Sequence, residues 1–253
     1  MPEFSFWSGK GSQPPADAPT PPKLKLTYWQ IRGLAAPLRM MLSFADIPFE
    51  ETRYAWGQAG DWFGTDKPAL QGRNALANLP NITNDSGVVT QSNACFMYVA
   101  RMTGLAGTDS DQLTKIEQVL FDTYDLRDAL CNMVYWYKGF CRNKGEFDEQ
   151  KGKYFAEKAM PFFDKQENWL GQVGSTFFTG DAPTAADFHV WEQLDQHIDL
   201  ASDVGAASPL EGREKLAAFY AAFKALPQLA NYFASDAYGL VRQPSVLPAR
   251  ARA

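Results

Sequence analysis

Tyr28 is the first residue in this sequence whose type and position could support chemistry. Apolar and polar residues alternate over residues 24–28, which predicts a strand that ends at this tyrosine, shortly before Gly33. Side chains at such strand ends face a cleft, where a neutral phenol can donate to a thiol sulfur and favour the thiolate. A pKa shift of about two units corresponds to about 2.7 kcal/mol and would ionise most of a thiol whose pKa is about 8.5. The alternative is a strand tyrosine that fills space.

The Leu79-Pro80 bond stands just before a predicted short strand at residues 81–83 and could present backbone to a ligand. An X-Pro bond at such a place can be cis. It would leave the N–H and C=O of Leu79 unpaired within the sheet, so that an extended peptide could add there as a further strand. The alternative is an ordinary trans turn.

Ser92 lies between a predicted strand at residues 88–89 and a predicted helix over residues 91–102. At a helix N-terminus the free N–H groups and the helix dipole favour an anion. The Ser92 hydroxyl could cap the helix or donate to a bound carboxylate, and the two roles are compatible.

These residues require a mixed α/β unit to position them. Residues 24–54 predict a strand, a helix that Pro37 opens, and a second strand, which together form a β-α-β unit. Residues 57–72 are rich in Gly, Asp and Trp and predict a loop. We therefore expect a sheet with helices over residues 23–105.

The remainder of the chain predicts helices only, over residues 106–243. Apolar residues recur every three or four positions over residues 113–134, which predicts a long amphipathic helix. Pro161 should kink or restart the next helix. Thr184 and Asp187 form a variant of the capping box and open a helix that we expect to run through His197.

Composition narrows the possible partners. The chain has 253 residues, 45% of them hydrophobic, and 24 Lys+Arg against 29 Asp+Glu give a net charge of −5. Such an acidic protein gains little from counterion release, which disfavours nucleic acid as its main partner. No run of about 18 apolar residues occurs, so we expect no membrane span.

Cysteine and histidine usage argues against a disulfide framework and against a metal. Cys95, Cys131 and Cys141 are odd in number and form no Cys-x-x-Cys pair, which favours small buried side chains in a reducing compartment. The only histidines, His189 and His197, would supply at most a two-ligand site and are expected to serve packing or to face solvent.

Residues 1–22 are rich in Pro, Gly and Ser and predict an extended arm rather than a secretory signal. Phe4, Phe6 and Trp7 cluster near its tip. Three aromatic side chains on such an arm could dock into a partner protein or fold back onto this chain. Residues 244–253 are expected to form a C-terminal tail.

Five short motifs follow one another in order along both units. They are LTYWQIRGLA at 26–35, NLP at 78–80, TQSNA at 90–94, YDLR at 124–127 with Tyr135 beyond it, and TAADF at 184–188. Together they resemble the mu class of glutathione transferases over residues 24–242, and five such motifs across both units are a specific signal.

The resemblance implies a thioredoxin-like N-terminal domain, a helical-bundle C-terminal domain and a cytoplasmic homodimer with a role in detoxification. It implies that glutathione is the co-substrate, that no metal is used, and that the glutathione thiolate is conjugated to small electrophilic, largely apolar substrates. An isomerase that uses glutathione would share the same site. The alternative function is a non-catalytic or weakly active glutathione-transferase-like subunit of a larger assembly.

The resemblance also assigns roles to individual residues. Tyr28 would donate to the glutathione sulfur, and Asp125 would reach the γ-glutamyl amino group of the other subunit's ligand. Tyr135 resembles a residue that can donate to an electrophile. The remaining glutathione-binding positions are Trp29, Asn78, Leu79, Pro80, Gln91 and Ser92. The pocket for the apolar co-substrate would be lined by Ile31, Leu34, Trp56, Tyr124, Cys131 and Tyr135. Thr184 and Asp187 would serve structural capping only.

Four features depart from the family's pattern. The loop at residues 58–72 lacks the usual Trp and Lys that grip the glycyl carboxylate, and Lys67, Trp62 or Arg73 could substitute. Leu76 replaces an aromatic residue of the dimer contact. Asp128 replaces an apolar pocket residue, which would disfavour bulky hydrophobic substrates. The N-terminal arm is additional.

Overall fold

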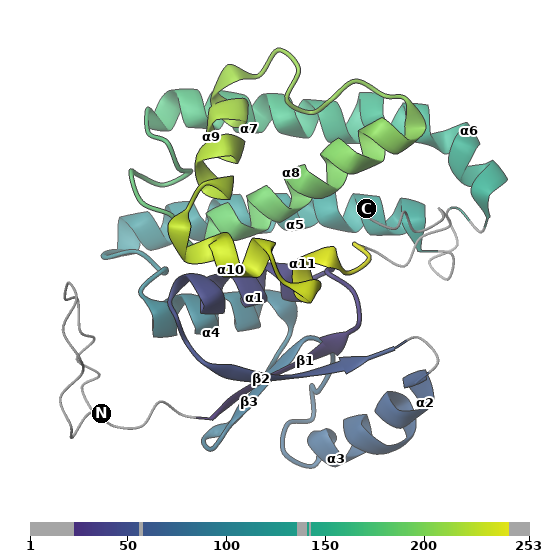
Figure 1. Ribbon diagram of the computed structural model, residues 1–253, viewed down its shortest axis with the longest axis vertical. Helices are drawn as coiled ribbons and strands as arrows, with labels where there is room; N and C mark the ends of the chain where they lie inside the picture. The colour runs from purple at the N-terminus through teal and green to yellow at the C-terminus, as the bar shows by residue number, and fades with distance from the viewer. Residues whose placement is uncertain (1–22, 56–57, 136–140, 142, 243–253) are drawn as a thin grey trace.

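The computed structural model describes residues 23–55, 58–135, 141 and 143–242 (Figure 1). The arm predicted for residues 1–22, the pocket residue Trp56 and the tail predicted for residues 244–253 lie outside the described residues. Within them, a four-stranded sheet with its helices comes first and a helical part follows. This is the α/β plus all-α class that the sequence predicts.

The first part is built on one mixed sheet with the strand order β2-β1-β3-β4. β1 and β2 run parallel, with Leu24 opposite Phe49, whereas β3 is antiparallel to β1 and to β4. The strands are β1 (Leu24–Trp29), β2 (Phe49–Tyr54), β3 (Asn81–Asn84) and β4 (Gly87–Thr90). The crossover helix α1 (Ala35–Phe44) and helix α4 (Ser92–Thr103) pack on each other between the sheet and the helical part (Figure 1).

The loop prediction for residues 57–72 is wrong. From residue 59 the chain forms α2 (Ala59–Asp61), the π-helical segment η2 (Trp62–Asp66) and α3 (Lys67–Gln71). Trp62 is fully buried, and its ring centroid lies 5.6 Å from that of Tyr54. Burial of Trp62 stabilises the helical segment by more than Gly60 and Gly64 destabilise it. Tertiary packing therefore overrides the low helix propensity of these glycines.

The second part consists of helices, and the longest is α5 (Ser110–Val134). The others are α6 (Lys144–Tyr154), the π-helical segment η4 (Phe155–Ala159), α7 (Met160–Val173), α8 (Ala185–Val204), α9 (Glu214–Lys224), the 3-10 segment η5 (Pro227–Leu229), α10 (Ala230–Phe233) and α11 (Asp236–Gly239). No helix among the described residues has the length and apolar composition needed to cross a bilayer.

Helix boundaries in this part follow local sequence signals. Pro161 lies in the first turn of α7, directly after the π-helical segment, so the predicted interruption is present. Thr184 caps α8 in the predicted capping box, with its N–H donating to Asp187 Oδ2 at 2.7 Å. The helix continues past His197 to Val204, because it ends only where Gly205 adopts a left-handed conformation with φ 70°.

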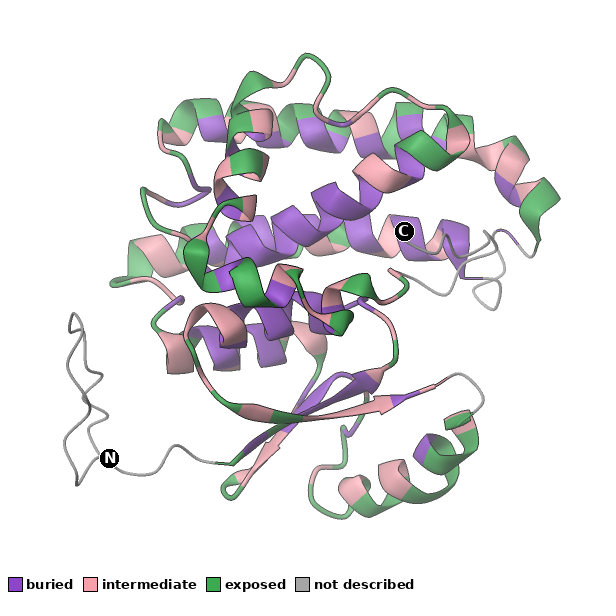
Figure 2. Ribbon diagram, in the orientation of Figure 1, coloured by how far each residue is buried: buried purple, intermediate pink, exposed green. Residues whose placement is uncertain are grey.

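α8 is the central element of the molecule. Its residues are buried along most of its length, and it packs against both α5 and α1 (Figure 2). A helix buried all round must pair every polar side chain that it carries into the core. Glu192 and Asp195 are such side chains, and both face Arg32 in the loop after β1.

Arg32 connects the sheet to α8 through a fully buried ion pair. Its Nη2 lies 2.5 Å from Glu192 Oε2, and its Nη1 lies 2.7 Å from Asp195 Oδ2. The guanidinium also lies over the Tyr238 ring, 4.6 Å from its centroid. Two carboxylates and one guanidinium therefore share a buried site, where removal of the cation would leave both anions uncompensated.

We expect Arg32→Met to lower the free energy of unfolding by about 3–5 kcal/mol, because it leaves Glu192 and Asp195 buried without their partner. Chemical denaturation followed by circular dichroism measures this. Lys144→Met removes the cation of an exposed pair with Asp148 and should cost less than about 1 kcal/mol. Equal losses in the two variants would contradict the importance assigned to the buried pair.

Both histidines are buried in the core, which fits a packing role. His197 Nδ1 donates to the Gln193 carbonyl at 2.6 Å, and its Nε2 accepts from the Tyr154 hydroxyl at 2.6 Å. His189 has no hydrogen-bond partner for either ring nitrogen among the described residues. Burial lowers the pKa of His197 to about 4, and burial with the charge of Arg127 lowers the pKa of His189 to about 3.

The two histidines should make stability fall as pH is lowered. In the unfolded chain each imidazole binds a proton near pH 6.5, whereas in the folded protein it stays neutral. Protonation therefore favours the unfolded state, and the free energy of unfolding falls as the pH drops below about 6.5. Between pH 7.5 and 5.5 each histidine should contribute about 1.4 kcal/mol of this loss. Denaturant titrations at both pH values measure the drop in the free energy of unfolding. In His197→Gln and in His189→Phe this drop should be smaller than in the parent protein by about 1.4 kcal/mol. Arg101→Met, at an exposed position, should keep the parent's full loss.

Candidate active site

Tyr28 lies at the end of β1 with only 3% of its surface exposed. Its hydroxyl oxygen accepts a hydrogen bond from the Leu34 N–H at 3.2 Å, and its own proton has no acceptor among the described residues. Burial raises the pKa of Tyr28, although the charge of Arg127 and the bond from Leu34 act in the opposite direction. The phenol therefore stays protonated at neutral pH and can donate its hydrogen to a ligand.

Gly33 allows the loop after β1 to close on this phenol. Its φ is +41°, and a Cβ atom at this position would lie 2.8 Å from both Oη and Cε1 of Tyr28. A side chain here would collide with the ring in a conformation that already favours glycine. Arg39 supports the same loop, because its Nη1 donates to the Ile31 carbonyl at 2.9 Å.

Leu79 presents unpaired backbone beside the sheet. The Leu79-Pro80 bond is cis, and neither backbone group of Leu79 has a partner among the described residues. Asn78 is fixed by Thr90, whose hydroxyl accepts from its N–H at 3.0 Å and donates to its carbonyl at 3.1 Å. This is the geometry that adding an extended peptide as a further strand requires.

Gln91 and Ser92 form the turn between β4 and α4. Gln91 has φ 70°, which is costly for a residue with a side chain, and such strain is found mainly at functional sites. Ser92 is the first residue of α4, and its hydroxyl makes no hydrogen bond among the described residues. Capping by this hydroxyl is therefore not seen, and the hydroxyl stays available to an anion.

Of the three residues proposed for the glycyl end, only Lys67 comes near the site. Its Nζ lies 5.7 Å from the centroid of the Phe63 ring, and that ring lies 6.0 Å from Trp29, the residue after Tyr28. Trp62 is turned into the core. Arg73 points toward the β3–β4 hairpin, where it donates to the Asn84 carbonyl at 3.5 Å. Phe63, the link between Lys67 and Trp29, was not predicted.

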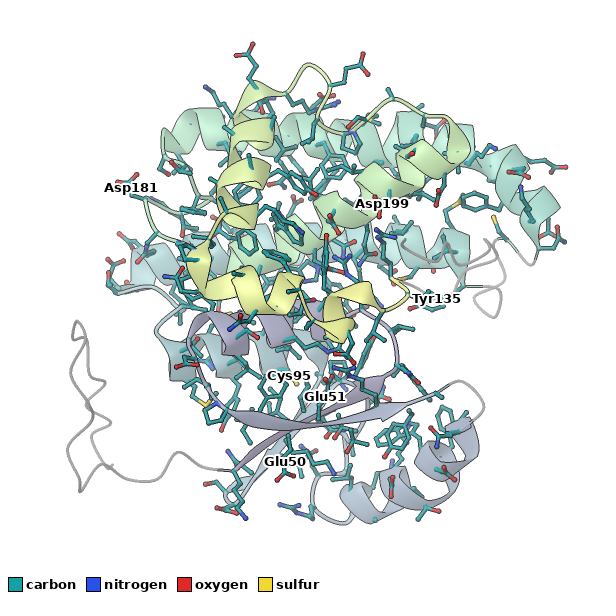
Figure 3. All side chains as sticks on the ribbon, in the orientation of Figure 1. Glu50, Glu51, Cys95, Tyr135, Asp181 and Asp199 are labelled. Atoms are coloured by element: carbon teal, nitrogen blue, oxygen red, sulfur yellow. The ribbon has the colours of Figure 1, made fainter. Side chains whose placement is uncertain are left out.

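One face of α5 completes the site. Tyr124, Cys131 and Tyr135 lie on it at helical spacing, with Tyr135 at the C-terminal end of the helix (Figure 3). Arg127 lies between them, and its Cζ is 5.7 Å from the centroid of the Tyr124 ring. The sequence analysis gave Arg127 no role. Its spacing from Tyr124 and Cys131, three and four positions away, could have indicated that it shares their face of the helix.

The other predicted pocket residues divide into two groups. Leu34 is buried and Ile31 half-buried in the loop beside Tyr28. Asp125 and Asp128 line a cavity of about 400 Å³ between α5 and α6. Tyr28 is not among the residues that line this cavity.

Other ionisable residues have structural roles. Cys95 and Cys141 are buried, as is Cys131 on the α5 face, and no disulfide joins them within the described residues. Asp187 accepts hydrogen bonds from Phe178 N–H and Thr184 N–H at the start of α8. Among the residues that the structure describes, no group of three His, Cys, Asp or Glu side chains is arranged to hold a metal ion.

A parallel β1-α1-β2 unit, a cis-proline edge and a buried strand-end phenol define a thioredoxin-like binding unit joined to a helical part. Family models agree with this class. The glutathione S-transferase N-terminal domain matches residues 24–101, and the C-terminal domain of the same family matches residues 124–236.

Known proteins resemble the chain over most of its length. Glutathione S-transferase Mu 1 of Oryctolagus cuniculus is 30% identical, with 88% of this chain and 95% of the relative covered. The class-mu 26 kDa isozyme 51 of Fasciola hepatica is 32% identical, with 85% and 89% covered. The crystal structure of the glutathione S-transferase Blo t 8 superposes with a TM-score of 0.72 at 27% identity, covering 88% of this chain and 99% of that one. The chain belongs to the glutathione S-transferase family.

Proposed function

We propose that the protein conjugates glutathione to small, largely apolar electrophiles. The observation that carries this proposal is Tyr28, a buried and protonated phenol whose hydrogen is free to bind a sulfur. The phenol stabilises the glutathione thiolate, whose electron pair forms the new S–C bond as the substrate releases its leaving group or takes up a proton. The protein contributes thiolate stabilisation and proximity.

The tripeptide would lie along the free edge beside the sheet. The N–H and C=O of Leu79 would pair with its cysteinyl backbone, with Asn78 and Pro80 fixing that edge. Gln91 and Ser92 would hold the γ-glutamyl carboxylate at the N-terminus of α4. Trp29 and Lys67 would hold the peptide near its glycyl end, and the Lys67 ammonium would bind the glycyl carboxylate. The electrophile would enter between this edge and the α5 face that carries Tyr124, Cys131 and Tyr135, beside Ile31 and Leu34.

A homodimer fits the remaining residues. Asp125 is exposed and lines the cavity between α5 and α6, as expected of a residue that reaches the partner's glutathione. Leu76 is an apolar side chain with 67% of its surface exposed, which a subunit contact would cover. We further propose domain boundaries at 23–105 and 106–243, and a cytoplasmic role in detoxification.

We expect Tyr28→Phe to lower kcat for an electrophilic aryl halide by one to three orders of magnitude, on the scale of losing a few kcal/mol of stabilisation. The pKa of the bound glutathione thiol, followed by the ultraviolet absorbance of the thiolate, should rise by about two units. Tyr98→Phe removes a hydroxyl that accepts a hydrogen bond from Asn84 Nδ2 at 2.6 Å, and it should leave both values unchanged. Unaltered turnover in Tyr28→Phe would refute the assignment.

Lys67→Met should weaken glutathione binding by about tenfold, since an ammonium–carboxylate contact contributes on the order of 1.4 kcal/mol. Calorimetric titration with glutathione measures the loss. Arg73→Met serves as the matched control, because it removes a positive charge a few residues away that points toward the hairpin. If Arg73→Met weakens binding and Lys67→Met does not, the glycyl end is held elsewhere.

A further inference from the structure

Arg127 is a buried cation without a counterion. Only 8% of its surface is exposed, and its Nε is enclosed without a hydrogen-bond partner among the described residues. The other two buried arginines are paired, Arg32 with Glu192 and Asp195, and Arg39 with Glu51 at 2.6 Å. No ion pair of Arg127 occurs in the part of the chain that the structure describes.

The described groups that interact with the charge of Arg127 are neutral at pH 7. Its guanidinium lies over the Tyr124 ring, and Tyr28, Cys131 and Tyr135 are close enough to interact with its charge. His189 faces the same region, with its ring 6.4 Å from that of Tyr124, and it stays uncharged above its lowered pKa. The positive charge is therefore directed into the site with aromatic and thiol groups around it.

An unpaired buried charge is expensive. Removing an ion from water costs several kcal/mol even after the protein relaxes, and aromatic faces return only part of that. Since guanidinium cannot lose its proton, the charge cannot be avoided by titration. No anion among the described residues offsets this cost. We therefore expect the anion to come from a ligand that binds beside Arg127.

Glutathione alone does not use this charge fully. Its thiolate is already the acceptor of the Tyr28 hydrogen, whereas addition to a conjugated carbonyl moves the negative charge from the sulfur to an oxygen of the substrate. As the S–C bond forms, the C=C electron pair moves to the carbonyl oxygen and gives an enolate, which later takes a proton from water at carbon. A primary alkyl halide creates no oxyanion, because its electron pair leaves with the halide.

We propose that Arg127 is the oxyanion-binding residue of the substrate pocket and directs this enzyme toward electrophiles that become oxyanions on addition, with conjugated carbonyls as the substrate class. This rests on the proposed function of the site. In this scheme the Tyr28 phenol stabilises the attacking sulfur, and the Arg127 guanidinium stabilises the negative charge that develops on the substrate oxygen.

The test compares two substrates, a conjugated enone and a primary alkyl iodide, in the full-length protein. Loss of one oxyanion donor lowers rates by about 10²–10³-fold. Arg127→Met should therefore lower kcat/KM for the enone by about that factor, and for the iodide by less than tenfold. Arg127→Lys should recover much of the enone activity, and the exposed-site variant Arg101→Met should change neither rate.

Stability gives a second readout that separates catalysis from folding. Because the cation is unpaired, Arg127→Met should unfold at an equal or higher denaturant concentration than the parent. A large loss of stability, or equal rate losses with both substrates, would overturn the proposal and indicate a structural role or a general effect on the thiolate. If the parent binds glutathione and converts the iodide but Arg127→Met keeps its enone rate, only this inference fails. If the parent neither binds glutathione nor converts either substrate, the proposed function fails with it.

Discussion

The buried ion pair between Arg32 and α8 is the contact on which the site depends. Arg32 and Gly33 are consecutive in the loop after β1, so the contact that fixes the guanidinium against Glu192 and Asp195 also fixes the glycine that lies against Tyr28. The N–H groups of Arg32 and Gly33 donate to the Val241 and Arg242 carbonyls at 2.8 and 2.9 Å. The loop is thus held by the helical part on one side and by the end of the described chain on the other.

The buried arginines Arg32 and Arg127 lie in opposite electrostatic surroundings. Arg32 is surrounded by carboxylates, which makes it a structural connection between the sheet and α8. The described neighbours that interact with the charge of Arg127 are tyrosine rings and a thiol, and the phenol of Tyr28 is one of them. An unpaired buried charge lowers stability, and this cost is the basis of the role proposed for Arg127.

Much of the fold could be predicted because its signals are local. Each of these signals acts over a few residues. The alternation over 24–28 marks strand β1, Gly104 in a left-handed conformation ends α4, and the capping box at Thr184 begins α8. The segment after residue 58 could not be read in this way. Its helices depend on Trp62 filling a space against Tyr54, and that space exists only once β2 is part of the sheet.

The sequence by itself determined the two-part architecture, the family, and the residue types able to bind a peptide and its thiol, because these follow from periodicity and from short motifs. Only the tertiary structure decided which side chains meet. It brought Lys67 toward Trp29 through Phe63 and turned Trp62 inward. It placed Asp125 and Asp128 at a cavity whose lining does not include Tyr28, and it gave Arg127 no anion among the described residues. These outcomes depend on contacts between residues far apart in the chain and on the loss of water around them, neither of which a linear pattern encodes.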